Sequence, residues 1–140
     1  LRADSKAAGR WNTHAGGDYF AIGVGGAVTG KGADLLIIDD PHSEQEAMQN
    51  SPDVYDKVFE WYSSGPRQRL QPGGAIVLVM TRWAKRDLTG HILEHSAARG
   101  GDDWEVIEFP ALMPSGTPLW PEFWAACSEM ASPVSAEPHL

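Results

Sequence analysis

The stretch GADLLIIDDPHSE, residues 32–44, places four consecutive apolar residues directly before two carboxylates and a proline. An unbroken apolar run such as 35–38 is typical of a central strand covered on both faces in a mostly parallel sheet. In open parallel sheets, ligands bind beyond the carboxyl ends of the strands. The sequence therefore predicts that Asp39 and Asp40 lie at the ligand-binding edge of an α/β sheet.

The two acids also have a chemical interpretation, because an apolar strand that ends in two carboxylates is the Walker B pattern. In nucleotide-hydrolysing motors the first acid holds Mg²⁺ and the second orients or deprotonates the attacking water. Neighbouring strand residues point to opposite faces, so the backbone must turn between Asp39 and Asp40 if both serve one site. Pro41 favours that exit. The alternative is that Asp39 ends the strand and Asp40 begins an ordinary turn.

The remainder of the chain completes an alternating pattern of strands and helices. We expect strands at 18–24, 35–38, 75–80 and 104–109, and helices from Ser51 to Gly65 and from Asp87 to Gly100. This order predicts an α/β fold with right-handed crossovers, in which helices flank a mostly parallel central sheet. Residues 1–110 form the expected domain. Residues 111–140 read as linker and disordered tail, with a short helix at 121–130.

Bulk properties exclude several classes of protein. The 140 residues carry a formal net charge of −8, which argues against broad electrostatic capture of nucleic acid. A single cysteine rules out an internal disulfide framework and a multi-cysteine zinc site. The five histidines share no metal-ligand spacing, and the longest apolar run, 75–80, is too short to cross a bilayer.

The glycine-rich stretch GGAVTGKG, residues 25–32, nearly matches the phosphate loop GxxxxGK[ST]. It lacks the final hydroxyl residue, and the expected strand at 35–38 follows where a phosphate loop needs a helix. We therefore predict a glycine-rich turn between two strands. The second buried run, 75–80, ends in Thr81 and Arg82 at the same sheet edge as the two acids, a position that senses the γ-phosphate in strand-based ATPases.

Three stretches taken together resemble the large subunit of the tailed-phage terminase, a DNA-packaging motor. They are GVGGAVTGKGADLLIIDDP, WYSSGPRQRLQPGG and AIVLVMTRWAKRDLTGHIL, and the resemblance runs from about residue 16 to 93 and on to PLWPE at 118–122. It implies the later half of an ATPase domain of the P-loop NTPase-like class. The family's C-terminal nuclease has no counterpart here, and the Walker A lysine is expected upstream of Leu1.

The resemblance implies roles for individual residues. Asp39 is the Mg²⁺-binding acid, Asp40 the catalytic carboxylate, and Thr81 and Arg82 belong to the motif that couples ATP hydrolysis to movement. Lys31 stands where relatives show an arginine that reaches the nucleotide of a neighbouring subunit. The chain departs from the family at 84–86, where relatives commonly read His-Glu-Asp and this sequence has Ala-Lys-Arg.

The resemblance further implies ATP and Mg²⁺ as cofactors, and double-stranded DNA, the portal protein and the small terminase subunit as partners. It implies a homo-oligomeric ring in the host cytoplasm, with no membrane association. The complete protein would be an ATPase and endonuclease, whereas this chain alone is expected to be inactive. Two alternatives stay open: a non-catalytic truncated prophage remnant or interaction module, and a Mg²⁺-dependent nuclease in which Asp87 joins Asp39 and Asp40.

Overall fold

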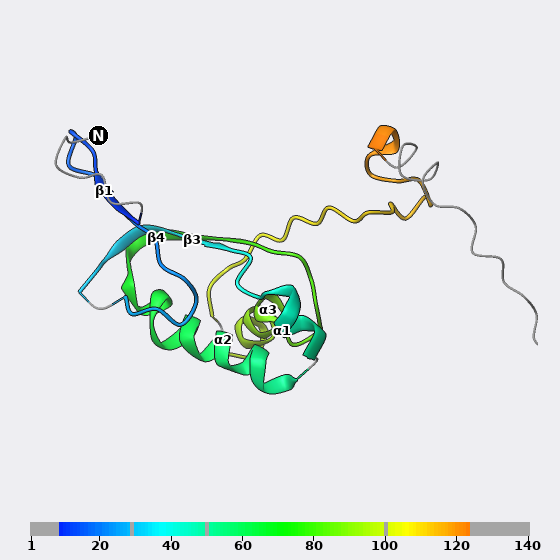
Figure 1. The fold of residues 1–140 in the computed structure, drawn as a ribbon, viewed down its shortest axis with the longest axis horizontal. Helices are drawn as coiled ribbons and strands as arrows, with labels where there is room; N and C mark the ends of the chain where they lie inside the picture. The colour runs from blue at the N-terminus through cyan, green and yellow to red at the C-terminus, as the bar shows by residue number, and fades with distance from the viewer. Residues whose placement is uncertain (1–8, 29, 50, 100, 124–140) are drawn as a thin grey trace, which may run out of the picture. The chain divides into compact units, whose positions relative to one another are not determined.

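The computed structural model describes residues 9–28, 30–49, 51–99 and 101–123. The chain divides into two units, 1–103 and 104–140. The first unit contains, in chain order, β1 (Arg10–Asn12), β2 (Asp18–Phe20), β3 (Ala33–Asp39), α1 (Glu44–Gln49), α2 (Pro52–Ser64), the 3₁₀ helix η1 (Pro66–Arg69), β4 (Leu70–Val79) and α3 (Leu88–Arg99) (Figure 1). The mixed α/β class expected from the sequence is confirmed.

Strands β3 and β4 form a parallel pair, and they are the only members of their sheet within the described residues. Their register runs from Leu35 opposite Ala75 to Asp39 opposite Val79. An irregularity precedes this register, because the segment QPGG of β4 bulges out of the pairing. Gly73 has a φ of +79° there, a backbone conformation that favours glycine.

Only one face of this strand pair is covered. Figure 1 shows the helices on the same side of the two strands, and Ile38, which is 4% exposed, belongs to the core on that side. The alternate residues are exposed, namely Leu35, Ile37, Val77 and Val79. The expectation that both faces are buried is therefore wrong. An unbroken apolar run cannot distinguish a strand with one covered face from a strand with two, because residues on both faces are apolar.

Helices α2 and α3 agree with the sequence. Ser51 has the extended backbone of an N-cap residue, Pro52 begins α2, and Gly65 follows its last residue. The buried side of α2 carries Tyr55, Val58 and Tyr62, which recur at the spacing of one helix face. Burial raises the pKa of Tyr62 to about 12, so this hydroxyl stays neutral in the core.

Helix α1 was not expected. Ser43 and Glu46 form a capping box, in which the Glu46 amide donates to Ser43 Oγ at 3.2 Å and the Ser43 amide donates to Glu46 Oε2 at 2.9 Å. The hydrogen bonds from Ser43 lower the pKa of Glu46. The signature Ser-x-x-Glu is visible in the sequence, but six residues are too few to show a helical period.

Two other expectations differ from the structure, and two more fall mostly or wholly on residues outside the described ranges. The strand expected at 18–24 is limited to β2, which pairs antiparallel with β1 in a separate hairpin. Residues 104–109 belong to no strand among the described residues, so that expectation is wrong. Of the helix expected at 121–130, residues 121–123 are helical, and the remainder lies outside the described residues, as does the expected tail at 131–140.

Membrane-spanning segments were also searched for. Within the described ranges, no helix combines the length and the apolar character needed to cross a membrane.

Candidate functional site

The acidic pair lies where β3 leaves the sheet. Asp39 is opposite Val79 in the parallel register, and the Asp40 amide donates to the Val79 carbonyl oxygen at 2.9 Å. Asp40 has a φ of +41° and is the only described non-glycine residue with a positive φ. The backbone therefore turns at Asp40, as it must if both acids serve one site and as it also would in an ordinary turn. Non-glycine residues in this region are uncommon, and they cluster at functional sites.

The carboxylates of this pair are open to solvent. Asp39 and Asp40 are both exposed, and none of the ion pairs among the described residues involves either. Carboxylate oxygens are ligands that Mg²⁺ prefers, and Mg²⁺ is commonly held by one or two carboxylates together with substrate phosphates. The pair fits that role. It does not form a cage by itself, because the described residues contain no group of three or more potential metal ligands.

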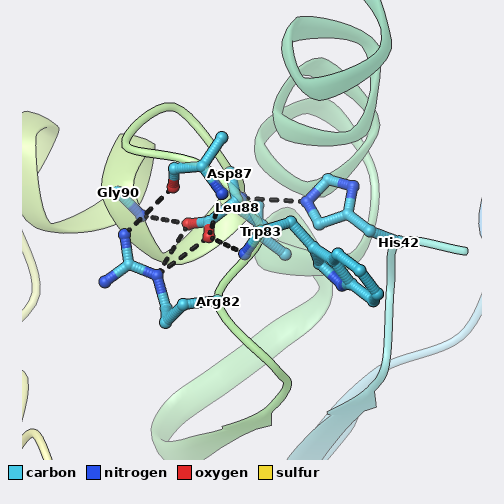
Figure 2. A network of polar contacts seen from close by, with 7 residues as sticks. His42, Arg82, Trp83, Asp87, Leu88 and Gly90 are labelled. Atoms are coloured by element: carbon cyan, nitrogen blue, oxygen red, sulfur yellow. Dashed lines mark hydrogen bonds and ion pairs between the residues drawn. The ribbon is translucent and has the colours of Figure 1, made fainter. Parts of the chain in front are cut away.

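A second carboxylate, Asp87, has the opposite environment (Figure 2). Its side chain is 0% exposed, and Arg82 Nε donates to its Oδ1 and Oδ2 at 3.1 and 2.8 Å. Its remaining donors are backbone amides, those of Trp83 at 3.0 Å, Ala84 at 3.3 Å and Gly90 at 3.0 Å. Because Gly90 is the third residue of α3, Asp87 is the N-cap of that helix.

The environment of Asp87 fixes its charge. Burial opposes ionisation, but the hydrogen bonds from Arg82, Gly90, Trp83 and Ala84 outweigh it and lower the pKa of Asp87 below its ordinary value. A buried carboxylate whose oxygens already accept these bonds is not available as a metal ligand. The nuclease alternative, which needs Asp87 beside Asp39 and Asp40, loses its third acid.

Gly90 allows the turn after β4 to pack against α3. A Cβ atom at this position would collide with the backbone carbonyl of Lys85. The contact is with backbone rather than with a flexible side chain, so the turn itself would have to move. Only glycine fits here without such a displacement.

The structure places the two residues expected at the coupling motif differently from each other. Thr81 is exposed and lies two residues beyond Val79, the residue opposite Asp39 in the parallel register. Arg82 is half-exposed and is held by Asp87 and by the Ala84 carbonyl oxygen, to which Nη2 donates at 3.3 Å. No contact tests a coupling role for either residue, and that role stays a prediction.

Residues 84–86, where the sequence differs from the terminase pattern that it resembles, have defined contacts in the structure. Ala84 joins the network through its backbone amide and carbonyl, which every residue except proline would also provide. Arg86 Nη2 donates to Asp56 Oδ1 of α2 at 2.9 Å, and His91 of α3 contacts the same oxygen at 2.9 Å. Arg86 thus contributes to the junction of α2 and α3.

The contacts of Lys31 are with β2 and not with the acidic pair. Its Nζ atom is 3.3 Å from Asp18 Oδ2 and 5.8 Å from the centre of the Phe20 ring, so it is associated with β2. The glycine-rich stretch before it leads directly into β3 and not into a helix. The strand expected directly after this stretch is confirmed, and a phosphate loop would need a helix there. A role of Lys31 at a neighbouring subunit's nucleotide is untested.

Sequence reasoning gave no role to His42, two residues after Asp40. Its side chain is buried at 4% exposure, and its Nε2 atom accepts a hydrogen bond from the Leu88 amide at 3.0 Å (Figure 2). Its ring meets Tyr55 of α2 edge-on at 5.1 Å. Burial lowers the pKa of His42, and the negative charges of Asp87 and Glu46 offset this only in part. The imidazole is therefore neutral at pH 7.

Comparisons with known proteins found no similarity, since no family model, no curated protein and no solved structure matches the chain. The function has to be argued from the geometry and from the sequence motifs.

Proposed function

We propose that this chain is part of a viral DNA-packaging motor, the terminase large subunit of a tailed phage. In this proposal it belongs to a P-loop NTPase-like domain that couples ATP hydrolysis to translocation of DNA into the procapsid. Asp39 holds Mg²⁺ on the β- and γ-phosphates, and Asp40 orients the attacking water. Thr81 and Arg82 respond to the nucleotide from the end of the neighbouring strand.

One observation carries the proposal: two exposed carboxylates lie at the end of a parallel strand, with the backbone turned between them. The left-handed conformation of Asp40 costs on the order of 1 kcal/mol, and although aspartate tolerates it better than most residues, such positions cluster at active sites and ligand clamps. The hydrogen bond to Val79 places this turn beside β4, whose continuation carries Thr81. This arrangement suits a cation shared between the protein and a phosphate.

A second candidate function is an interaction module without catalysis. The observation that favours it is the uncovered apolar face of the β3–β4 pair, with Ile37 62% exposed. Solvent-exposed apolar residues gathered on one sheet face are typical of a surface that another protein segment covers. In this alternative, Asp39 and Asp40 are solvated residues of a turn.

The two candidates differ in what substitution of each acid does to the assembled packaging motor. Asp40→Asn should retain binding of Mg-ATP but lower kcat by at least about a hundredfold, because general-base and water-orienting groups contribute about 10²–10⁴-fold. Asp39→Asn should instead weaken the Mg²⁺-dependent binding of nucleotide. Asp34→Asn, on the same strand but remote from its end, is the matched control and should behave as wild type. Unchanged ATPase rates in all three variants would favour the interaction module.

The isolated chain provides a further test. Its loop at 25–32 has no following helix whose amides could hold phosphate, so we expect no ATP hydrolysis above background. If calorimetry showed micromolar binding of Mg-ATP that Lys31→Ala abolished, the loop would be a phosphate loop after all.

A further inference from the structure

The N-terminus of α3 has an unusual backbone partner. Leu88 is the first residue of the helix, and amides in the first turn have no acceptor within their own helix. The Asp87 carboxylate accepts from Gly90, whereas the Leu88 amide donates to His42 Nε2, 46 residues earlier in the chain. This hydrogen bond is buried. It joins the segment that leaves β3 to the helix that follows β4.

His42 is held firmly at its own end of this link. It follows Pro41, which is also buried, and its ring packs edge-on against Tyr55. Between the strand hydrogen bond at Asp40 and the buried His42 ring there is only one intervening residue. A displacement of the acidic pair should therefore also displace the ring, because only one residue of backbone separates them.

The choice of histidine carries information about the link. Because Nε2 accepts a hydrogen bond, the proton of the neutral ring is on Nδ1, and Nδ1 is buried without a partner among the described residues. An unpaired buried donor is unfavourable, and a phenylalanine would fill similar space without it. What distinguishes histidine here is the acceptor that it offers to Leu88.

We propose that His42 is a positioning residue, which ties the turn carrying Asp39 and Asp40 to the N-terminus of α3 through the hydrogen bond from Leu88. Movement of the acidic pair is thereby passed to the helix that follows Thr81 and Arg82. The purpose of this link rests on the proposed function, in which both segments respond to nucleotide. The link itself requires neither nucleotide nor Mg²⁺ and is tested without them.

The test uses NMR spectroscopy on the wild-type chain, His42→Gln and His42→Phe. Glutamine offers an oxygen close to the position of Nε2, and phenylalanine keeps the ring without the acceptor. We expect the Leu88 amide to exchange with solvent about tenfold faster in His42→Phe and at nearly the wild-type rate in His42→Gln. Long-range ¹H–¹⁵N spectra should show the wild-type ring protonated on Nδ1.

Transmission is tested by adding Asp40→Val to each protein. A β-branched residue does not hold a φ of +41° without strain, so this change displaces the turn. Its effect on the Leu88 amide shift should be present in the wild type and His42→Gln and lost in His42→Phe. Wild-type protection of Leu88 in His42→Phe, a ring protonated on Nε2, or no response of Leu88 to Asp40→Val would each overturn the proposal. The tautomer and the wild-type response decide the matter even if His42→Phe does not fold.

In the assembled motor, His42→Phe should lower kcat for ATP with little change in KM, and His42→Gln should restore kcat. Loss of packing alone would not be rescued by glutamine. If the motor function is wrong but the link is right, the NMR results stand and no ATPase is found. If the link is wrong, the acid variants still lose activity while Leu88 exchanges independently of residue 42.

Discussion

The carboxylates that follow the two parallel strands have opposite environments. Asp87, after β4, is fully buried and accepts hydrogen bonds from one guanidinium and three backbone amides. Asp39 and Asp40, at the end of β3, are exposed and take part in none of the ion pairs among the described residues. The Asp87 carboxylate is part of the packed structure, whereas the carboxylates of Asp39 and Asp40 face solvent. A structural carboxylate differs from one that can bind a ligand in the number of hydrogen-bond donors around it, and not in its charge.

The largest effect should come from deleting Asp87. Asp87→Ala leaves the part-buried amides of Trp83, Ala84 and Gly90 and the Arg82 guanidinium without their acceptor, and an unsatisfied amide costs up to about 1–3 kcal/mol where water does not replace the partner. We expect a loss of about 3 kcal/mol or more in the free energy of unfolding, measured by urea denaturation. Asp39→Ala is the matched control and should change stability by less than about 0.5 kcal/mol. Similar losses in both variants would contradict the contrast.

Substitution of Gly90 tests how tightly the turn around the buried Asp87 carboxylate is packed against α3. An exposed glycine in a helix gains up to about 1 kcal/mol on replacement by alanine. Gly90→Ala should have the opposite sign and cost on the order of 2 kcal/mol, because the new Cβ meets the Lys85 carbonyl. Thr89→Ala, one residue earlier in α3, is the control and should be nearly neutral in thermal unfolding. A stabilised Gly90→Ala variant would show that the turn is free to move.

The contributions of His42 and Asp87 to the free energy of unfolding should change in different pH ranges. The folded pKa of His42 lies below the ordinary value of 6.5, so between the two values the unfolded chain binds more protons than the folded chain. Stability should therefore fall as pH decreases below 6.5 and level off once the folded pKa is passed. The folded pKa of Asp87 is also lowered, so its contribution is lost only below its ordinary value of 3.8.

The measurement compares urea unfolding of the wild type and His42→Gln from pH 7.5 to 3. Contributions from the other histidines are common to both proteins and cancel in the difference. We expect the step below pH 6.5 to shrink in His42→Gln, whereas the step below 3.8 persists. A wild-type profile in His42→Gln would assign the first step to another group.

Local signals in the sequence were sufficient for some of these features. The apolar runs of β3 and β4, the Ser51-Pro52 start of α2 and the Asp87 cap of α3 are all determined by neighbours in the chain, and the structure contains them. Asp39 and Asp40 stood out for the same reason, because an acid pair after an apolar run is a local pattern.

Other features depend on residues that are distant in sequence. The uncovered face of the β3–β4 pair follows from where the helices pack, and apolar residues such as Ile37 and Ile38 give no sign of it. The contact of His42 with Leu88 spans 46 residues, and a single histidine after a turn has no period or spacing that reveals its partner. Tertiary packing, rather than local propensity, decided both.

The smallest change in stability, and the sharpest test of the exposed pair, is expected for Asp40→Gly. Glycine adopts the φ of +41° without steric cost, which recovers on the order of 1 kcal/mol, but it also increases the entropy of the unfolded chain by about 0.4–1 kcal/mol. We expect a net change within about 0.5 kcal/mol in thermal unfolding. Asp34→Gly is the matched control, because Asp34 lies in β3, beside the register irregularity, and has no positive φ; it should be destabilised by about 0.5–1 kcal/mol. Equal losses in the two variants would remove the argument that the turn at Asp40 is strained, and with it the main structural reason to read the acidic pair as a functional site.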